Sequence, residues 1–250
     1  MNTVFKLSII LSLLLGISFS SQASGLVAHK ASYAAKIKKG ISIKGKAVRE
    51  LKKSANGPWL YSFNVTSLVA SIDESTLLSW QDNQVVPYSY NYKLSVFLAR
   101  DKLKKINFDW RKMTAINPSK KKPWEITNIP SNTHDSLSYQ LQLGMDLQSG
   151  KQDMLYLVAH KGKLRQNHFR VTGEEEINTA FGILESITVE KVRKKANRRK
   201  TNLWFSKQYP LLLLKMVQVE KDGERYEINI TQASIGGKDI TFNYSAAKSK

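Results

Sequence analysis

Hydrophobic and polar residues alternate along most of this sequence with a period of two. In residues 59–65 every second position is aromatic or branched: Trp59, Tyr61, Phe63 and Val65. Residues 41–51 alternate in the same way, and Asn56-Gly57-Pro58 marks a turn between the two segments. Side chains two positions apart share a face of a β-strand, whereas an amphipathic helix repeats its apolar residues every three or four positions. The pattern therefore predicts two β-strands joined by a turn.

The same pattern recurs to the end of the chain, with turn signals between the segments. Asp222-Gly223 is a hairpin dipeptide, and Lys161-Gly162-Lys163 separates another pair of apolar segments. These signals predict one antiparallel meander, folded as a curved sheet or an incomplete barrel. Its further strands are expected at residues 26–38, 74–81, 84–97, 104–110, 112–116, 154–160, 164–171, 174–180, 183–192, 201–206, 212–220 and 225–233.

One segment changes period and predicts a single short helix at residues 136–148. Leu137, Leu141 and Met145 recur every four residues, and Gly150 follows the expected end. Thr133 or Asp135 can cap the start, although Leu143 and Gly144 blur the pattern. The preceding residues 117–133 contain three prolines and are predicted to form a loop over the surface.

The first residues have the plan of a secretory signal peptide. Lys6 precedes an apolar run at residues 7–19, and Ser21-Gln22-Ala23 places small residues at a cleavage site. The run is shorter than the roughly 18 apolar residues of a membrane-spanning helix. We therefore expect cleavage after Ala23, with an uncleaved anchor as the alternative. Residues 24–245 are then expected to form one β-rich domain, and residues 246–250 a polar tail.

The chain is strongly basic and holds no cysteine. It has 39 Lys and Arg residues against 20 Asp and Glu residues, a net charge of +19 at pH 7. In an exported protein such a charge meets anionic lipids and envelope polymers before it meets nucleic acid. Without cysteine there is no disulfide and no thiol that could carry a lipid anchor. We therefore expect a soluble periplasmic protein with a lipid-like or anionic envelope partner, and nucleic acid is an unfavoured partner.

Basic residues are densest in residues 191–200, and residues 194–200, between two predicted strands, are interpreted as a hairpin tip. Such a tip can be solvated charge that deters pairing of sheet edges. It can also contact an anionic partner, together with the lysine run in the loop at residues 117–133. The residues expected at such an anionic contact are Lys120, Lys121, Lys122, Arg193, Lys194, Arg198 and Arg199.

Large aromatic residues could form an apolar ligand face. Core packing is the default interpretation for them. However, one short helix cannot cover a long sheet, so part of the concave face must meet the tail, a partner or a ligand. The residues expected on that face are Trp59, Phe63, Trp80, Phe108, Trp110 and Trp204.

Signals for catalysis, metal binding or cofactor binding are weak. The sequence has no Gly-x-Ser-x-Gly motif and no glycine-rich phosphate loop. His134 and Asp135 are interpreted as a loop residue and a helix cap, not as a dyad. His160 and His168 lie on opposite arms of a predicted hairpin and could face each other, but no third metal ligand accompanies them. Alternation sends Glu175 to one face and its neighbours to the other, so residues 174–176 are not a paired-carboxylate site. We predict no catalytic residue, metal or cofactor.

Several short motifs occur in the order found in one bacterial family. They are Pro87-Tyr88-Ser89-Tyr90, Asn107-Phe108-Asp109-Trp110, Asp135-Ser136-Leu137-Ser138, residues 185–191 after Phe181-Gly182, Arg198-Arg199-Lys200-Thr201 before Leu203-Trp204-Phe205, Tyr209-Pro210-Leu211 and Asp222-Gly223. Over roughly residues 33–230 the chain resembles the exported family catalogued as domain of unknown function 3108. The resemblance implies a mostly β protein of unassigned activity, shaped as a curved sheet or incomplete barrel. By analogy, it is similar to envelope carriers that hold lipid in a half-open barrel; it supplies no catalytic residue.

These observations favour a periplasmic binding or assembly factor for an envelope component, without catalysis. One alternative is an envelope adaptor that binds another protein through a sheet edge. A less favoured alternative is an enzyme acting on glycans through carboxylates, for which Asp109 and Asp135 are the first acids to test.

Overall fold

The structure is a computed structural model that describes residues 25–39, 41–55, 57–193 and 199–241. The predicted signal segment and the tail at residues 246–250 lie outside these ranges. The first half contains β1 (His29–Lys39), β2 (Ile41–Lys53), β3 (Trp59–Ser67), β4 (Ala70–Gln81), β5 (Gln84–Val96), β6 (Lys102–Asp109), β7 (Thr114–Asn117), β8 (Trp124–Ile126) and β9 (Thr133–His134). The second half contains α1 (Ser138–Gln148), β10 (Asp153–His160), β11 (Lys163–Thr179), β12 (Gly182–Val192), β13 (Lys200–Ser206), β14 (Leu213–Val219), β15 (Arg225–Ile235) and β16 (Lys238–Asp239).

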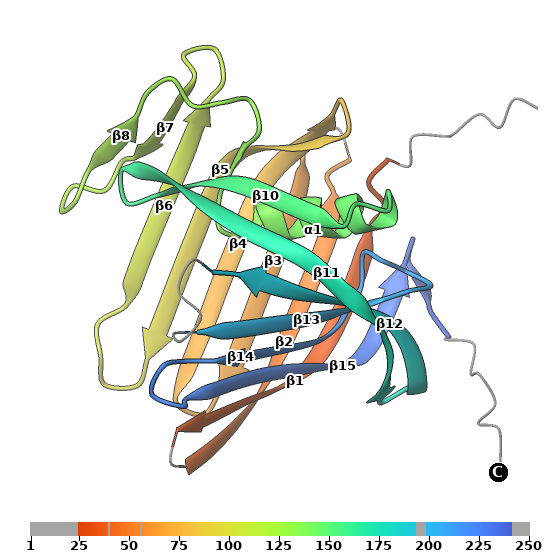
Figure 1. Cartoon of the computed structure of the whole chain (residues 1–250). Coiled ribbons are helices and arrows are strands. Elements are labelled where there is room, and N and C mark those ends of the chain that lie inside the picture. Colours follow the sequence, from red (N-terminus) through yellow and green to blue (C-terminus); the bar gives the residue numbers. More distant parts are fainter. Residues whose placement is uncertain (1–24, 40, 56, 194–198, 242–250) are drawn as a thin grey trace, which may run out of the picture.

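The described strands form a single open sheet, in the order β8-β7-β6-β5-β4-β3-β2-β1-β15-β14-β13-β12-β11-β10-β9, with β16 beside β15. Neighbouring strands are antiparallel, except that β9 runs parallel to β10. The sheet curves back so that β10–β15 cross over β1–β6 (Figure 1). The predicted curved sheet with one helix is therefore confirmed, because the strands at the two ends of the order do not meet.

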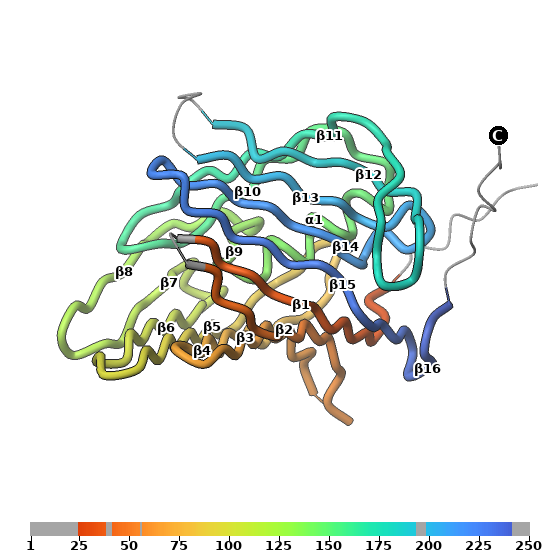
Figure 2. Tube along the Cα trace, turned by 90° about the horizontal axis from the view of Figure 1, so that it is seen from below, coloured from red at the N-terminus to blue at the C-terminus, as the bar shows by residue number. Residues whose placement is uncertain are grey.

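Helix α1 lies inside the curved sheet, between its two halves (Figure 2). It sits close to the β4–β5 turn and to the β13–β14 connection. The Gln142 side chain bonds the backbone of β5, and a Cβ atom on Gly144 would lie 3.3 Å from Leu211 Cα. We call the edge of the sheet that contains the β4–β5 turn and the β13–β14 connection the helix margin. The β3–β4, β5–β6, β10–β11 and β14–β15 turns lie along the opposite side, which we call the far margin.

Burial on both sides of α1 explains why its sequence pattern is blurred. Leu141 and Met145 belong to a cluster with residues of β2–β6, whereas Leu143 and Leu147 pack in a second cluster formed mainly by β10–β15. Gly144 lets the β13–β14 connection approach the helix backbone. A helix enclosed by two halves of a sheet needs apolar residues on all sides, so it does not show one clean amphipathic stripe.

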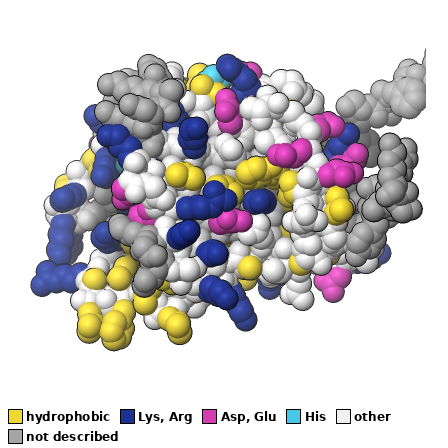
Figure 3. Space-filling model, turned by 60° about the horizontal axis from the view of Figure 1, so that its bottom comes forward, with side chains coloured by type: hydrophobic (Ala, Val, Ile, Leu, Met, Phe, Trp, Pro, Cys, Tyr) yellow, Lys and Arg dark blue, Asp and Glu magenta, His cyan; other side chains and the backbone are white. Residues whose placement is uncertain are grey.

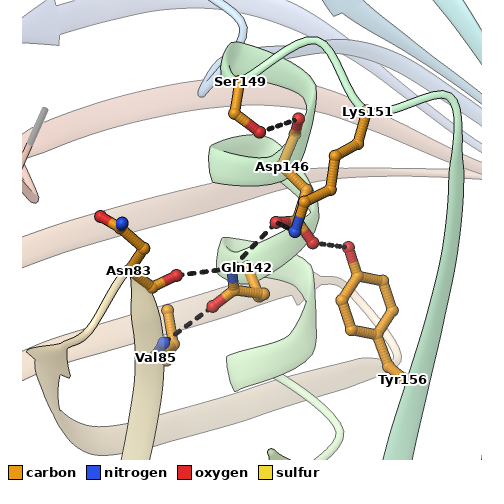
Figure 4. Close-up of polar contacts among 7 residues, drawn as sticks. All are labelled: Asn83, Val85, Gln142, Asp146, Ser149, Lys151 and Tyr156. Carbon is orange, nitrogen blue, oxygen red and sulfur yellow. Dashed lines mark hydrogen bonds and ion pairs between the residues drawn. The ribbon is translucent and has the colours of Figure 1, made fainter. Parts of the chain in front are cut away.

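Polar side chains of α1 connect it to both halves of the sheet (Figure 4). The backbone N–H of Val85 in β5 donates to Gln142 Oε1 at 2.7 Å. Tyr156 in β10 donates its hydroxyl to Asp146 Oδ2 at 2.7 Å, and Lys151 Nζ lies 2.7 Å from Asp146 Oδ1. Gln142 also donates to Asp146 at 3.1 Å, so the contacts form one network. These bonds satisfy buried polar groups and fix the helix in the interior.

The start of α1 differs from the prediction in detail. Asp135 does hold the start, because its Oδ1 accepts the N–H groups of Leu137 and Ser138 at 2.8 and 2.9 Å and the Thr76 hydroxyl at 2.9 Å. The helix itself begins at Ser138, two residues later than expected. His134, expected in a loop, lies buried in β9.

The prediction that residues 117–133 form only a surface loop was wrong. This segment contains β8, and Ile129 is buried in the core. Strands of two or three residues carry too little alternation to be recognised in a sequence. In the part of the chain that the structure describes, no helix has the length and apolarity needed to cross a bilayer.

Candidate functional site

A cavity of about 950 Å³ lies beside β6, under the β7–β8 connection and the β10–β11 turn; we call it the lysine groove. Its apolar lining includes Leu103, Ile106, Pro123 and Trp124. Its basic lining consists of Lys102, Lys104, Lys105, Lys120, Lys121, Lys122 and Lys161. Asp101 is the one acidic residue among the described residues that line the groove, and it forms an ion pair with Lys93 at 3.1 Å. The groove therefore combines an apolar wall with a large excess of positive charge.

The groove exists because β6 extends beyond its neighbour. β5 pairs with β6 over residues 102–107, whereas β7 pairs with residues 107–109. Within the described chain, residues 102–106 have no strand partner on the β7 side. The chain between β7 and β8 instead passes over this edge with its three lysines. Local pairing thus leaves an open backbone edge next to a basic loop.

Positive charges in the groove affect one another. Lys104 Nζ lies 4.2 Å from the centre of the Tyr92 ring. Partial burial lowers the pKa of Lys104, and the charges of Lys161 and Lys102 lower it further, while Glu74 opposes them. His160 lies nearby, and burial and the charges of Arg165, Lys104 and Lys161 lower its pKa. An anion in the groove would relieve this repulsion.

A second cavity of about 170 Å³, the interior pocket, lies between α1 and strands β2 and β11–β14. Arg49 of β2 points into it and is only 6% exposed. Its guanidinium donates to Gln140 Oε1 at 2.8 Å and lies 5.0 Å from the centre of the Phe63 ring. Lys191 of β12 donates to Asn167 Oδ1 at 2.7 Å and lies 5.3 Å from the centre of the Phe169 ring. The pocket is thus lined by two cations and by aromatic rings.

Five of the six aromatic residues expected on a ligand face lie on the concave side. Trp59, Phe63, Trp80 and Trp110 pack, partly exposed, against the core cluster around α1, and Phe108 belongs to that cluster. The Phe108 and Trp110 rings stack with centres 5.6 Å apart, and the Trp110 indole N–H donates to a backbone carbonyl. These contacts are core packing, and the lysine groove is lined by Trp124 instead.

Trp204 lies apart from the other five. Its neighbours Leu203 and Phe205 line the interior pocket, so the Trp204 side chain points to the outer face of β13. There its indole N–H donates to Glu175, and Lys215 lies 5.2 Å from its ring centre.

The predicted basic residues fall into separate places. Lys120, Lys121 and Lys122 line the lysine groove. Arg193 donates to the Thr201 hydroxyl at 3.4 Å near the interior pocket, and Arg199 pairs with Glu220 at 2.6 Å. Lys194 and Arg198 lie outside the described residues. The hairpin interpretation of this run agrees with the antiparallel pairing of β12 and β13.

Sequence reasoning missed the lysines of β6 and missed Arg49. The run Lys102-Leu-Lys-Lys, which overlaps the start of a predicted strand, was an available signal, because strands rarely carry lysine on both faces unless they are edges. Arg49 lies between Ala47 and Leu51 on the inward face of β2, so a charge at an apolar position was the signal there.

The remaining polar residues take structural places. Asp109 accepts the N–H groups of Arg111 and Lys112 in a turn, both at 3.1 Å. Burial raises the pKa of Asp135, which lies inside the helix cap. In the hairpin register His160 is opposite Lys163 and His168 is opposite Leu155. The two imidazoles therefore do not face each other, which the sequence had left possible. His168 contacts Asp153 at 2.6 Å instead.

Comparison with known proteins places the chain in a family. The model of the family described as "Protein of unknown function (DUF3108)" matches residues 32–231. The chain belongs to this family. The predicted resemblance is thereby confirmed, and DUF3108 describes nearly the whole of the sheet. None of the curated proteins matches the sequence.

Solved structures show what the DUF3108 fold is similar to. A beta-barrel-like protein of the DUF1849 family from Brucella abortus shares 12% identity, with a TM-score of 0.55, over 84% of this chain and 98% of that one. This likeness concerns the fold alone. The MucA/MucB complex of Pseudomonas aeruginosa aligns at 10% identity and a TM-score of 0.32, over 86% of this chain and 54% of that one. A DUF1329 protein from Desulfovibrio piger aligns at 10% identity and a TM-score of 0.31, over 91% and 90%.

Proposed function

We propose that this DUF3108 protein is an exported binding or assembly factor that holds an anionic, lipid-like envelope component in the lysine groove, without catalysis. The observation that carries the proposal is the composition of the groove: apolar Leu103, Ile106 and Trp124 beside seven lysines in one cavity. An amphiphile has the complementary chemistry, with an apolar chain and a negative head group.

The size of the groove suits this role. Its volume of about 950 Å³ lies at the upper end of the roughly 300–1,000 Å³ usual for small-molecule sites. Each methylene group removed from water contributes about 0.8 kcal/mol. An acyl chain on Leu103, Ile106 and Trp124 would therefore supply affinity, and the lysines would select a negative head group.

Export and location are part of the proposal. The signal-like residues 1–23, cut after Ala23, would release the chain into the periplasm, where anionic lipids and polymers are abundant. The net charge of +19 supports attraction to such partners.

One observation favours an adaptor as the second candidate. The free backbone edge of β6 at residues 102–106 could pair with an extended segment of another envelope protein. Crosslinking in cells followed by pull-down would recover a protein partner in that case, and the capture would depend on this edge.

The binding proposal is tested with a fluorescent anionic fatty acid and the purified mature chain. The variant K120Q/K121Q/K122Q removes three groove charges, and K30Q/K52Q/K221Q is the control, because it removes three exposed lysines elsewhere. At about 0.5–1 kcal/mol for each charge pair, the groove variant should bind roughly ten- to a hundredfold more weakly. The control should stay close to the original protein.

Equal affinity for both variants would contradict the groove as the site. Equal affinity for a neutral alcohol of the same chain length would contradict selection of anions. Mass spectrometry of lipids extracted from protein purified from its own periplasm would identify the natural ligand.

A further inference from the structure

We propose that the interior pocket is a second binding site, which holds a small oxyanion, a carboxylate or a phosphate group, on Arg49 and Lys191. It is separate from the lysine groove in position and in lining, so it does not depend on the proposed function. The argument starts from the charge balance inside the curved sheet.

Arg49 is a buried cation that forms no ion pair within the part of the chain that the structure describes. Its guanidinium hydrogen-bonds to the neutral side chains of Gln140 and Tyr61, and its buried Nε has no hydrogen-bond partner. The acid whose charge helps to raise the pKa of Arg49 is Glu74, which accepts the Tyr90 hydroxyl at 2.6 Å and makes no ion pair with Arg49 among the described residues. An uncompensated buried charge is costly, and a bound anion is a common way to offset it.

Lys191 is a second cation in the pocket whose hydrogen-bond partner is neutral. Its ammonium group donates to neutral Asn167, and among the described residues it forms no ion pair. Burial, together with the charges of Arg193 and Arg199, lowers the pKa of Lys191 to about 8. Like Arg49, Arg193 has a buried Nε with no hydrogen-bond partner. Cations from β2 and β12 thus converge on one cavity, which no described carboxylate enters.

The shape of the pocket limits the ligand. A volume of about 170 Å³ corresponds to roughly five or six water molecules, each about 30 Å³ in the liquid. The opposite wall is apolar, formed by Leu203, Phe205 and Met216. Such a cavity admits a carboxylate or phosphate that carries a short apolar group, and it excludes a long acyl chain.

Calorimetric titration with inorganic phosphate and with butyrate tests the site and separates the two oxyanions. The buffer holds chloride at constant ionic strength. The site variants are R49M and K191M; the controls R165M and K200M remove exposed cations of the same types. We expect at least one oxyanion to bind the original protein, at least tenfold loss in each site variant, and less than twofold change in the controls.

The remaining outcomes overturn the proposal. One is that neither oxyanion binds the original protein, and another is that R49M and K191M bind as tightly as the original protein. Loss of binding in K120Q/K121Q/K122Q, with binding retained in K191M, would move the site to the lysine groove. Lys191 is half-buried, so K191M keeps the test decisive if R49M does not fold.

A different observation supports an interaction surface at the far margin. Four large apolar side chains at the tips of two turns are exposed, and we call them the tip patch. Their exposed fractions are 97% for Leu68, 42% for Val69, 74% for Phe97 and 92% for Leu98. The Phe97 N–H donates to the Val69 carbonyl at 2.9 Å, so the two turns lie side by side. Contiguous exposed apolar groups on a protein surface usually mark a contact.

The backbone conformation and the charges around the tip patch indicate which kind of partner it contacts. Leu98 has a φ of 58°, a conformation unfavourable for leucine, and it is nevertheless held outward. Arg100 and Lys102 lie in the following residues, Asp101 between them pairs with Lys93, and Lys46 lies opposite Thr66 beside the β3–β4 turn. Figure 3 shows a group of hydrophobic side chains at the lower left, with Lys and Arg side chains near it. We infer that the tip patch inserts into the surface of an anionic lipid bilayer, because exposed apolar tips with an excess of cations beside them have that complementarity.

Co-sedimentation with vesicles tests the tip patch. The vesicles contain phosphatidylglycerol and phosphatidylcholine, or phosphatidylcholine alone. The variant L68S/F97S/L98S should lose at least tenfold in binding to the mixed vesicles. The control L77S/L155S/I183S, which removes exposed apolar residues from strand faces, should not. Equal binding by both variants would refute the inference, as would equal binding of the original protein to both kinds of vesicle.

Discussion

The burial of His134 predicts a specific loss of stability in acid. This side chain is 3% exposed, its Nδ1 has no hydrogen-bond partner, and its ring meets the Tyr156 ring edge-on with centres 5.7 Å apart. Burial lowers the pKa of His134 from its ordinary value of 6.5 to about 4, although the charge of Asp146 opposes the change. The unfolded chain therefore binds a proton more readily than the folded chain. Stability from this group is complete above pH 6.5 and is lost as the pH falls toward 4.

The magnitude follows from those two pKa values. Over the whole interval the loss is about 3 kcal/mol, at about 1.4 kcal/mol for each pH unit. At pH 5 the unfolded imidazole is almost fully protonated and the folded one is not, so about 2 kcal/mol is lost relative to pH 7. The variant H134F keeps a planar ring in place but cannot titrate.

Urea unfolding at pH 7 and at pH 5 measures the difference. The free energy of unfolding of the original protein should fall by about 2 kcal/mol more than that of H134F between the two pH values. His29, which is also buried with a lowered pKa, is present in both proteins and cancels in the comparison. The same pH dependence in both proteins would refute the reasoning, and an NMR titration of the His134 ring would give its pKa directly.

Three further predictions concern α1 and the groove. D135A should lower the free energy of unfolding in urea by about 3 kcal/mol, because two N–H groups at the start of α1 and the Thr76 hydroxyl of β4 lose their acceptor; an effect below 1 kcal/mol would contradict this. G144L should lower the free energy of unfolding by about 1–3 kcal/mol, and with it the thermal midpoint, since any Cβ there comes 3.3 Å from Leu211 Cα; unchanged melting would show that the connection moves aside. Binding of an anionic amphiphile should change the tryptophan emission of the original protein and of W204F, but much less that of W124F, because Trp124 lines the groove.

Much of the fold could be predicted because its information is local. The alternation in residues 59–65 correctly predicted β3, and Asp222-Gly223 correctly predicted the β14–β15 turn. The strands β8 and β9 could not be predicted in this way. β9 consists of two residues whose partners, Leu157 and Val158, lie in β10, beyond the helix. Its existence depends on a distant pairing, and no repeat within two residues can reveal that.

The candidate sites were predicted only in part, for a related reason. Lys120–Lys122 were recognised as a basic loop, and they do line the groove. Their partners in β6 and at Lys161 come from other segments, which meet only after folding. In residues 203–205 three successive apolar side chains remove the alternation that would have shown Trp204 facing outward.

The sequence by itself determined the antiparallel meander, the single helix and the excess of basic charge, because period, turn residues and composition are properties of neighbouring positions. Only the tertiary structure decided that α1 enters the curved sheet, that β6 extends past β7, and that Arg49 and Lys191 line one cavity. Those features depend on the curvature of the sheet and on contacts between residues far apart in the chain. Such contacts depend on packing in three dimensions, and local periodicity does not record them.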